Sequence, residues 1–575
     1  MTSERISNTQ SYDFDAIVIG SGITGGWAAK ELTEKGLKVL VLERGRDMPH
    51  GTGYLGEHAP SWKVPFNGKP QRELEVEEFP VQSKLYAFRT TNMQFWNNDK
   101  ANPYASDEGK PFEWYRGGIV GGKSLMWGRQ TYRFSEEDFK ANSRDGYGIP
   151  WPVDYAEIAP WYSYVEKFIG VNGKKEGLAQ LPDGEFQQPM PWFAIEETIQ
   201  RRLKKNAPDI TLTNARTAIL TEDLHNRAAC HYCGPCEDGC STGSYFSSQS
   251  STLPAAKATN NLTLKSNSMV ERLEYDKDSG KISRVHVVDA NTMERSTFSA
   301  RIFFLCASTV GTTQLLLNSV SEEFPNGLAN SSGVLGRYLM DHFAGIGIAG
   351  MFTENADTYY SGNRPTGLNI PRFRNVQKQD EDVDFVRGYG YQTAISSSNW
   401  MSQLNSKGFG AGLKDQLRKI PPTWTFYTTA FGECLPQKNN RISLSKTQKD
   451  RFGMPQVVFD FTWGNNEKAM ARDIKSQGER IMKAAGAAFA MPFGDTETLS
   501  MPGSAVHEMG TARMGDDPKH SVLNKHNQAH DVPNLFVTDG SFMASSSCVN
   551  PSLTYMAFTA RACDYAVKQM QAGYL

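Results

Sequence analysis

The chain has 575 residues, and its 61 Lys and Arg residues nearly balance its 63 Asp and Glu residues, which gives a formal net charge of −2. This balance lacks the large basic excess of a nucleic-acid-binding protein, and no apolar run approaches the roughly 20 residues of a membrane-spanning helix. The first residues carry neither a basic and apolar leader nor paired arginines. We therefore expect no nucleic-acid partner, no membrane span, no export signal of its own and a cytoplasmic location by default.

The first predicted elements form a β–α–β unit. Residues 14–20 are a short buried strand, residues 27–35 a helix and residues 38–43 a second strand. A unit of this length, about 30 residues, is the setting that a dinucleotide-binding fold requires. From residue 45 to residue 116 the chain is rich in Pro, Gly, Asn and aromatic residues, which predicts long surface excursions.

The later elements return to the same pattern near the end of the chain. They are a strand, a helix, a strand-rich stretch, a long helix, a strand and a closing helix, at residues 301–306, 312–318, 343–463, 467–487, 534–539 and 554–571. Strands typical of a dinucleotide fold thus occur at both ends. The sequence predicts an α/β protein with a discontinuous Rossmann-like domain, and a second, α+β domain built on an antiparallel sheet.

A glycine-rich turn follows the first strand and opens the first helix. Gly20 permits the tight turn, Gly22 lets the backbone approach a pyrophosphate, and Gly25 allows close packing of helix on strand. Glu43 ends the second strand, where its carboxylate can accept hydrogen bonds from ribose hydroxyls. The alternative is a glycine turn in an unrelated α/β protein, and the motif alone does not distinguish NAD from FAD.

Four of the eight cysteines lie within eleven residues: Cys230, Cys233, Cys236 and Cys240. Their C-x2-C-x2-C-x3-C spacing is that of ferredoxin-type iron–sulfur ligands, except that Ser241 replaces the usual following Pro. Structural zinc usually takes two cysteine pairs separated by a longer stretch. We expect an iron–sulfur cluster here, with zinc and disulfides as the alternatives.

Five segments in the correct order along the chain resemble the glucose–methanol–choline (GMC) oxidoreductases: the glycine-rich opening and residues 121–124, 334–342, 507–515 and 539–554. The resemblance implies FAD, bound by a domain made of residues 1–50, 111–135, 225–345 and 495–575, which also carries the cysteine loop. Residues 51–110, 136–224 and 346–494 would then form the substrate-binding domain and its excursions.

The same resemblance names the positions that would contact FAD: Gly20, Gly22, Gly25, Glu43, Gly121, Gly122, Ser124, Val270, Asp539 and Gly540. Two departures lie in one loop. Trp127 stands where many relatives have Asn, and Met126 stands where relatives with a histidyl-linked flavin have His. We therefore expect FAD to be held without a covalent bond.

Oxidation of an alcohol by hydride transfer to flavin N5 also requires a base for the hydroxyl proton, and an unperturbed His has a pKa near 6.5. His507 is the candidate base, and the resemblance makes Asn550 its partner, an amide that can orient the substrate oxygen. The alternative for His507 is a core histidine bonded to a backbone carbonyl. We expect packing or surface roles for the remaining candidates, His342, His520, His526 and His530.

Within this family, the chain resembles the flavoprotein subunits of bacterial fructose, glucose and gluconate dehydrogenases, which carry C-x5-C-x3-C and a [3Fe–4S] cluster. Cys230, Cys236 and Cys240 reproduce that pattern. Cys233 is additional, and it would either complete a [4Fe–4S] cluster or pair elsewhere. The resemblance also implies a small subunit, which could export the chain to the periplasm with it, and a cytochrome acceptor.

These expectations combine into an FAD-dependent dehydrogenase that oxidises a secondary hydroxyl of a sugar or glycoside to a ketone, with C3 of a glucoside favoured and electrons leaving through the iron–sulfur cluster. Several tryptophans could stack on sugar rings: Trp96, Trp114, Trp127, Trp151 and Trp161. The alternatives are an oxidase or dehydrogenase of a non-sugar alcohol with structural cysteines, and a non-catalytic flavoprotein.

Overall fold

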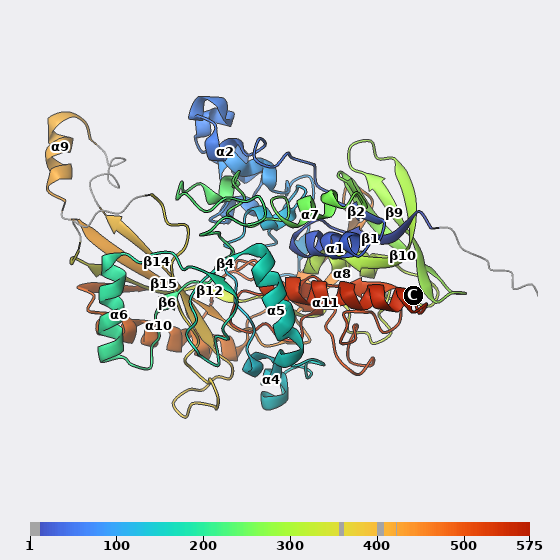
Figure 1. The fold of residues 1–575 in the computed structure, drawn as a ribbon. Helices are drawn as coiled ribbons and strands as arrows, with labels where there is room; N and C mark the ends of the chain where they lie inside the picture. Colours follow the sequence, from blue (N-terminus) through green and yellow to red (C-terminus); the bar gives the residue numbers. More distant parts are fainter. Residues whose placement is uncertain (1–11, 356–361, 399–407, 421) are drawn as a thin grey trace, which may run out of the picture.

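The computed structural model describes residues 12–355, 362–398, 408–420 and 422–575 (Figure 1). Residues 1–11, on which the expectation about an export signal rests, lie outside these ranges. The described residues form three main β-sheets with helices packed against them. No helix among them combines the length and the apolar character needed to cross a bilayer.

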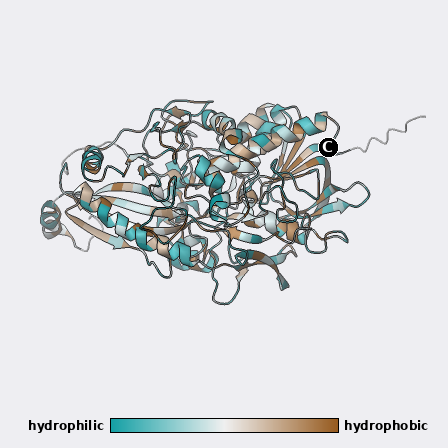
Figure 2. Cartoon of the chain, turned by 90° about the horizontal axis from the view of Figure 1, so that it is seen from below, coloured by the Kyte–Doolittle hydropathy of each residue, from teal (hydrophilic) through white to brown (hydrophobic). Residues whose placement is uncertain are grey.

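The first sheet joins both ends of the chain. Its centre is β1 (Phe14–Ile19), which lies parallel between β2 (Val39–Leu42) and β10 (Arg295–Leu305). On the outer sides, β7 (Leu262–Lys265) pairs with β2, and β20 (Leu535–Val537) pairs with β10. The strands at its centre are buried, and they are largely brown beside the C-terminus in Figure 2. This is typical of a parallel sheet with helices on both faces.

The first half of β10 leaves this parallel arrangement and pairs antiparallel with a hairpin made of β8 (Ser268–Asp276) and β9 (Lys281–Asp289). Helix α1 (Ile23–Glu34) packs against α11 (Ser552–Gln571), the blue and red helices of Figure 1. The other helices packed around this sheet are α5 (Tyr155–Ile169), α7 (Thr252–Ala258) and α8 (Thr309–Asn318).

In the second sheet, every described strand pairing is antiparallel. Its strand order is β18 (Phe489–Phe493), β12 (Phe343–Phe352), β15 (Thr423–Gly432), β14 (Tyr389–Ser398), β13 (Leu368–Ile370) and β6 (Thr213–Asn214). Helix α10 (Asn465–Ala485) covers one face and packs against α6 (Ala194–Asn206). Alternate residues of β15 are buried, so the other face is left to line a cavity.

The third sheet has the order β19 (Met509–Thr511), β11 (Arg337–Met340), β16 (Arg441–Lys449), β17 (Pro455–Asp460) and β3 (Ala105–Ser106). Strand β11 ends opposite the start of β19, where Met340 pairs with Met509. This pairing brings the residues that follow β11 next to those that precede β19.

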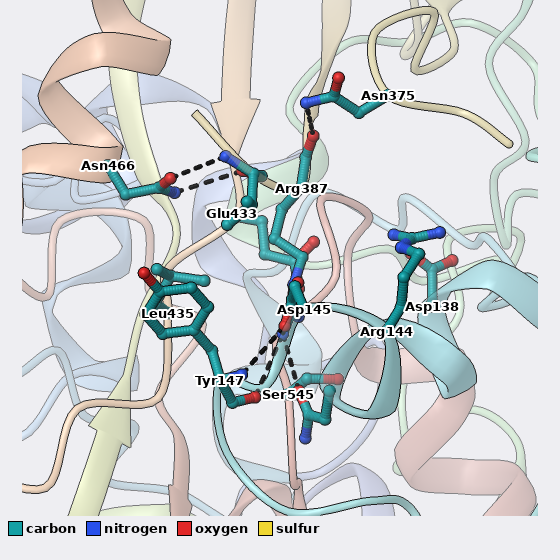
Figure 3. A network of polar contacts seen from close by, with 12 residues as sticks. Asp138, Arg144, Asp145, Tyr147, Asn375, Arg387, Glu433, Leu435, Asn466 and Ser545 are labelled. Atoms are coloured by element: carbon teal, nitrogen blue, oxygen red, sulfur yellow. Dashed lines mark hydrogen bonds and ion pairs between the residues drawn. The ribbon is translucent and has the colours of Figure 1, made fainter. Parts of the chain in front are cut away.

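The remaining described elements are short or lie at the periphery: α2 (Leu55–His58), α3 (Arg72–Glu78), α4 (Glu136–Asp145), α9 (Gly410–Arg418), β4 (Val171–Asn172) and β5 (Phe186–Gln187). Arg387, which is 1% exposed, ties α4 to the second sheet (Figure 3). Its guanidinium donates to Glu433 Oε1 at 2.6 Å and to both carboxylate oxygens of Asp145. One buried cation thus joins the end of α4 to the strands that bear the cavity.

The predicted fold class is confirmed: the β–α–β unit, the strands at both ends and the closing helix are all present. Helix α1 begins at Ile23 instead of residue 27, because Gly22 is its N-cap and the glycines that follow are helical. The stretch from residue 45 to 116 contains a small buried core around Tyr54, Trp96 and Tyr115, so it is more than a surface excursion. Helices α4 to α6 were outside the sequence-based expectation.

Candidate active site

A cavity of about 850 Å³ is lined by residues of both the first and the second sheet. This volume lies within the range of roughly 300–1,000 Å³ that is typical of ligand sites. Most of the site residues predicted from the sequence line it: Gly20, Gly22, Glu43, Gly122, Ser124, Val270, His507, Asp539, Gly540 and Asn550. Segments hundreds of residues apart in the chain therefore meet at one site.

The glycine turn has the geometry of a pyrophosphate cradle. Gly20 has φ +97°, and a Cβ on Gly25 would lie 1.9 Å from the carbonyl oxygen of Gly20, so both positions require glycine. A Cβ on Gly22 would meet no protein atom within 4 Å. Gly22 caps α1 without a side-chain hydrogen bond, which leaves the first N–H groups of the helix available to an anion.

The carboxylate of Glu43 holds the turn together from the end of β2. Its Oε2 accepts hydrogen bonds from the backbone N–H and the hydroxyl of Ser21 at 3.0 and 2.7 Å, and its Oε1 accepts from the N–H of Gly45 at 2.7 Å. A carboxylate has about four acceptor sites. Glu43 thus retains capacity for the predicted ribose contact, which stays a prediction.

The loop at residues 121–124 packs directly on this turn. The N–H of Gly121 donates to the hydroxyl of Ser21 at 2.9 Å, and the Ser124 hydroxyl donates to the Gly121 carbonyl at 2.6 Å. Gly121 has φ +90° and lies behind the cavity wall, whereas Gly122 lines it. Position 121 requires glycine because its backbone has a positive φ.

The far wall carries the other predicted FAD contacts. Val270 lies on β8, and Asp539 and Gly540 follow β20. Burial raises the pKa of the Asp539 carboxyl, whose oxygens accept hydrogen bonds from Ser541 and Thr312. These contacts hold the Asp539 side chain at the cavity wall.

The two predicted catalytic side chains meet at this cavity. His507 Nε2 lies 3.2 Å from Asn550 Nδ2. Asn550 directly precedes Pro551, the N-cap of α11, and His507 lies two residues before β19. The backbone N–H of His507 donates to Asp341 Oδ1 at 3.0 Å, which fixes its position.

Two further residues contact this pair, and neither contact was predicted from the sequence. His342 Nδ1 lies 2.9 Å from His507 Nδ1. The expected packing role of His342 agrees with its full burial and its contacts with the Ser546 and Ser547 carbonyls, but His342 also contacts the predicted base. It reaches His507 because Met340 pairs with Met509 in the third sheet. Gln392, on β14, donates from Nε2 to Asn550 Oδ1. No local pattern could have found them, since strand pairing between distant segments places both.

Burial changes the acid–base character of the site. It lowers the pKa of His507 well below 6.5, with further lowering from the neighbouring His342 and Lys123. Burial also lowers the pKa of His342 to about 4 and raises that of the Asp341 carboxyl to about 7. The imidazole of His507 is therefore neutral at physiological pH, as a general base must be.

The cysteine loop lies behind another wall of the cavity. Cys230, Cys236 and Cys240 are half-buried around Ile219 and Tyr245, whereas Cys233 is exposed, and all eight cysteines are free thiols. Within the described ranges, no three His, Cys, Asp or Glu side chains are arranged to hold a metal ion. The described geometry therefore shows no formed site for the expected iron–sulfur cluster or for the zinc alternative.

Two buried arginines near this loop have no carboxylate among the hydrogen-bond partners found in the described residues. Arg129, 1% exposed, donates to backbone carbonyls and lies with its guanidinium carbon 3.4 Å from the ring centroid of Tyr245. Arg227, 3% exposed, also donates only to carbonyls, and its Nε has no partner. Burial lowers the pKa of both guanidinium groups, and the Cys240 thiol acts in the opposite sense on each. Two positive charges thus lie beside the cysteines.

The tryptophans proposed as sugar-stacking faces divide into two groups. Trp96, Trp114 and Trp127 line the cavity. Trp151 and Trp161 are absent from its lining; Trp151 lies in the main hydrophobic core, and the partly buried Trp161 packs against it. Trp127 is fixed by a hydrogen bond from its Nε1 to the Phe246 carbonyl at 3.1 Å.

Comparison with known proteins identifies the family to which the chain belongs. Two sequence models described as GMC oxidoreductase match residues 14–344 and 436–559. The chain is 29% identical to a 2-methyl-1,2-propanediol dehydrogenase of Mycolicibacterium austroafricanum, across 97% of this chain and 96% of that protein. It is 28% identical to a fructose dehydrogenase large subunit of Gluconobacter japonicus, across 98% and 100%. A pyridoxine 4-oxidase from Mesorbium loti has a similar fold, with a TM-score of 0.55, 14% identity and coverage of 96% and 99%.

Proposed function

The chain belongs to the GMC oxidoreductase family and is an FAD-dependent oxidoreductase of CH–OH groups, and from this premise we propose that it dehydrogenates a secondary hydroxyl of a sugar or glycoside, with C3 of a glucoside favoured. In this proposal residues 1–50, 111–135, 225–345 and 495–575 bind FAD. Residues 51–110, 136–224 and 346–494 bind the substrate.

The observation that carries the proposal is the contact between His507 Nε2 and Asn550 Nδ2 on the cavity wall. A substrate hydroxyl that displaces this contact and lies within reach of both nitrogens donates its hydrogen bond to the imidazole and accepts one from the amide. His507 then removes the proton, while Asn550 stabilises the charge that develops on the oxygen. When bound, FAD supplies the acceptor for the carbinol hydrogen and its electron pair.

The residues at the cavity fit FAD. Gly22 leaves room where a pyrophosphate would lie, and the uncapped start of α1 offers N–H groups to it. Met126 lines the cavity with a thioether, which is not a group that forms the histidyl link. We therefore propose non-covalent binding.

Two observations favour a sugar as the substrate. The cavity is lined by aromatic side chains of β15, Tyr427 and Phe431, and by Trp127 from the loop after residue 125, which can stack on sugar rings. In addition, the name of one relative, fructose dehydrogenase large subunit, specifies a sugar. The choice of C3 rests on the resemblance to bacterial glycoside-oxidising enzymes of this type.

A non-sugar diol is the second candidate substrate. Another relative of similar identity is a 2-methyl-1,2-propanediol dehydrogenase. The same base and amide would serve a small diol, because both substrates present a hydroxyl on a carbon that loses hydride. The two candidates differ in how much of the aromatic lining the substrate uses.

We also propose that the cysteine loop binds an iron–sulfur cluster, which would supply a one-electron carrier. The support is the ligand spacing, the two buried arginines that would balance an anionic cluster, and N–H groups that point at sulfur. Tyr232 and Tyr245 donate to Cys230 and Cys240, each at 3.4 Å. Because the described residues show no formed metal site, the proposal requires the loop to rearrange around the cluster, with Cys233 either as a fourth ligand or outside the ligand set.

Contacts between the cavity and this loop are continuous. Trp127 donates to the carbonyl of Phe246, and the next residue back, Tyr245, donates its N–H to Cys240. This short route favours a dehydrogenase that passes electrons to a separate carrier. A small partner subunit and a cytochrome acceptor are the partners we propose, on the basis of the resemblance to the flavoprotein subunits of bacterial sugar dehydrogenases.

The test is anaerobic flavin bleaching by the purified holoenzyme against a panel of sugars, glycosides and small diols, with the product located by NMR. Bleaching by a glucoside with a 3-keto product supports the lead proposal. Bleaching only by small diols would favour the second candidate, and bleaching by no compound would contradict both.

A further inference from the structure

We propose that His342 is a positioning residue that fixes the tautomer of His507, so that the lone pair on His507 Nε2 faces the substrate. Gln392 plays the matching part at the other end, where it fixes the orientation of the Asn550 amide. The inference rests on the function proposed above, in which His507 is the base. It follows from matching donors to acceptors along one hydrogen-bonded series of four buried or half-buried side chains, those of His342, His507, Asn550 and Gln392.

The chain of hydrogen bonds starts at two backbone carbonyls. His342 Nε2 lies 2.8 Å from the carbonyl oxygen of Ser547 and 3.2 Å from that of Ser546. A carbonyl oxygen can only accept, so Nε2 carries a hydrogen. His342 is fully buried and burial lowers its pKa to about 4, so the ring is neutral and its Nδ1 is an acceptor.

This acceptor determines the state of the neighbouring ring. His507 Nδ1 lies 2.9 Å from His342 Nδ1, and two ring nitrogens at this distance need one donor and one acceptor. Because His342 Nδ1 accepts, His507 Nδ1 must donate. In the neutral ring of His507, the lone pair therefore lies on Nε2.

The contacts of Gln392 and Asn550, at the other end of the hydrogen-bonded series, agree with a lone pair on His507 Nε2. Gln392 Nε2 donates to Asn550 Oδ1, and Asn550 Nδ2 donates to His507 Nε2 at 3.2 Å. The reversed amide would place the Asn550 oxygen against the His507 lone pair and its NH₂ against the Gln392 NH₂. Both contacts would be mismatched, so Gln392 favours the orientation in which Asn550 presents N–H groups to the substrate.

The alternative tautomer would disable the site. His507 Nε2 would then carry a hydrogen and could not take the substrate's proton, while the lone pairs of both Nδ1 atoms would face each other. In a serine protease, loss of the group that sets the tautomer of the catalytic histidine costs about 10⁴-fold in kcat. His342 acts here through a neutral ring, in place of a carboxylate.

The test uses the FAD-loaded enzyme with His342→Leu and His342→Gln. Leu removes both hydrogen bonds, whereas Gln can accept from His507 with Oε1 and donate to Ser547 with Nε2. We expect His342→Leu to lower kcat by about 10²–10⁴-fold, with a small change in KM, and His342→Gln to restore most of the loss. His530→Leu is the matched control, because it removes a half-buried histidine that bonds a carbonyl away from the cavity.

A second readout does not depend on turnover. In the wild-type protein labelled with ¹⁵N-histidine, and assigned with His507→Ala, we expect a protonated Nδ1 and an unprotonated Nε2 for His507. A proton on Nε2 would overturn the proposal, and this measurement decides the matter if His342→Leu fails to fold. Equal inactivity of both FAD-loaded His342 variants, or full activity of His342→Leu, would also overturn it. If no sugar or diol is oxidised but the tautomer is as stated, the proposed substrates fail and this inference stands.

Discussion

His507 and Asn550 are 43 residues apart in the chain, yet His507 Nε2 lies 3.2 Å from Asn550 Nδ2 at the wall of the cavity. The third sheet positions His507, through the pairing of β19 with β11, and the start of α11 positions Asn550. Because the two side chains come from separately packed elements, their contact forms only when the third sheet and α11 are both in place. In the function proposed above, His507 is the base and Asn550 is the amide that orients the substrate oxygen.

Alanine substitutions at two positions of the glycine turn should have different effects, one on FAD binding and the other on the stability of the apo-protein. Gly22→Ala adds a Cβ that meets no protein atom within 4 Å but would occupy the space where we propose that the pyrophosphate binds. It should fold with unchanged thermal stability of the apo-protein and lose FAD. Gly25→Ala would place its Cβ 1.9 Å from the Gly20 carbonyl, so it should lower the apo-protein stability itself.

The measurements are flavin content by absorbance and the unfolding temperature of the apo-proteins. Gly412→Ala, in exposed α9 with open space around its Cβ, is the control. It should leave the flavin content unchanged and should not lower the unfolding temperature. Full FAD retention by Gly22→Ala would show that the pyrophosphate does not lie at this turn.

The pH dependence of kcat/KM should differ from that of an enzyme whose base is a histidine with an ordinary pKa. A base whose pKa is lowered stays deprotonated as the pH falls, so the rate constant is lost only well below pH 6.5. Asp341, with a pKa raised to about 7, becomes anionic as the pH rises through that value, and it accepts the His507 N–H. We therefore expect at most a shallow rise in kcat/KM near pH 7 in the wild type.

Asp341→Asn should remove that rise and leave kcat/KM flat between pH 6 and pH 8. The profile should be measured with an electron acceptor whose reduction does not involve protons. A tenfold loss for each unit below pH 6.5 in Asp341→Asn would mean that His507 titrates normally, contrary to its burial.

The Arg387 network should dominate the stability of the contact between α4 and the second sheet. Arg387→Met leaves the buried Glu433 and the adjacent Asp145 without their cation, and breaking a buried pair in this way costs about 3–5 kcal/mol. Chemical denaturation should show this loss. Arg418→Met, which removes an exposed partner of Asp415, should be indistinguishable from wild type. Equal stability of both variants would show that the network in Figure 3 contributes no net energy.

Iron analysis tests the cysteine loop. Protein prepared without oxygen should contain iron and acid-labile sulfide, and Cys236→Ser should lose both while FAD remains. Cys563→Ala, in the buried core of α11, should retain them. Iron-free wild-type protein, prepared with cluster-assembly factors present, would contradict the cluster proposal and leave the cysteines a structural role.

Part of this site could be predicted from sequence because it is encoded locally. The turn from Gly20 to Gly25 and Glu43 lie within one β–α–β unit, where spacing determines position. His507 and Asn550 were found through resemblance, since nothing in their own neighbourhood distinguishes a base from a core histidine.

The remainder depends on long-range packing. His342 contacts His507 across 165 residues, and Gln392 contacts Asn550 across 158, because strands from different sheets end at the same cavity. The low pKa of His507 is likewise a result of burial in the assembled fold. Although residues 334–342 resemble the family, no periodicity or motif predicts the contact of His342 with His507 or the low pKa of His507.

The most direct test of the central claim is the rate of anaerobic flavin reduction in wild type and His507→Ala, with the substrate found in the panel. We predict that His507→Ala keeps its FAD and reduces it about 10²–10⁴-fold more slowly. His520→Ala, which changes a histidine with a 66% exposed side chain, should match wild type. Flavin reduction at the wild-type rate in His507→Ala would contradict the assignment of this histidine as the base.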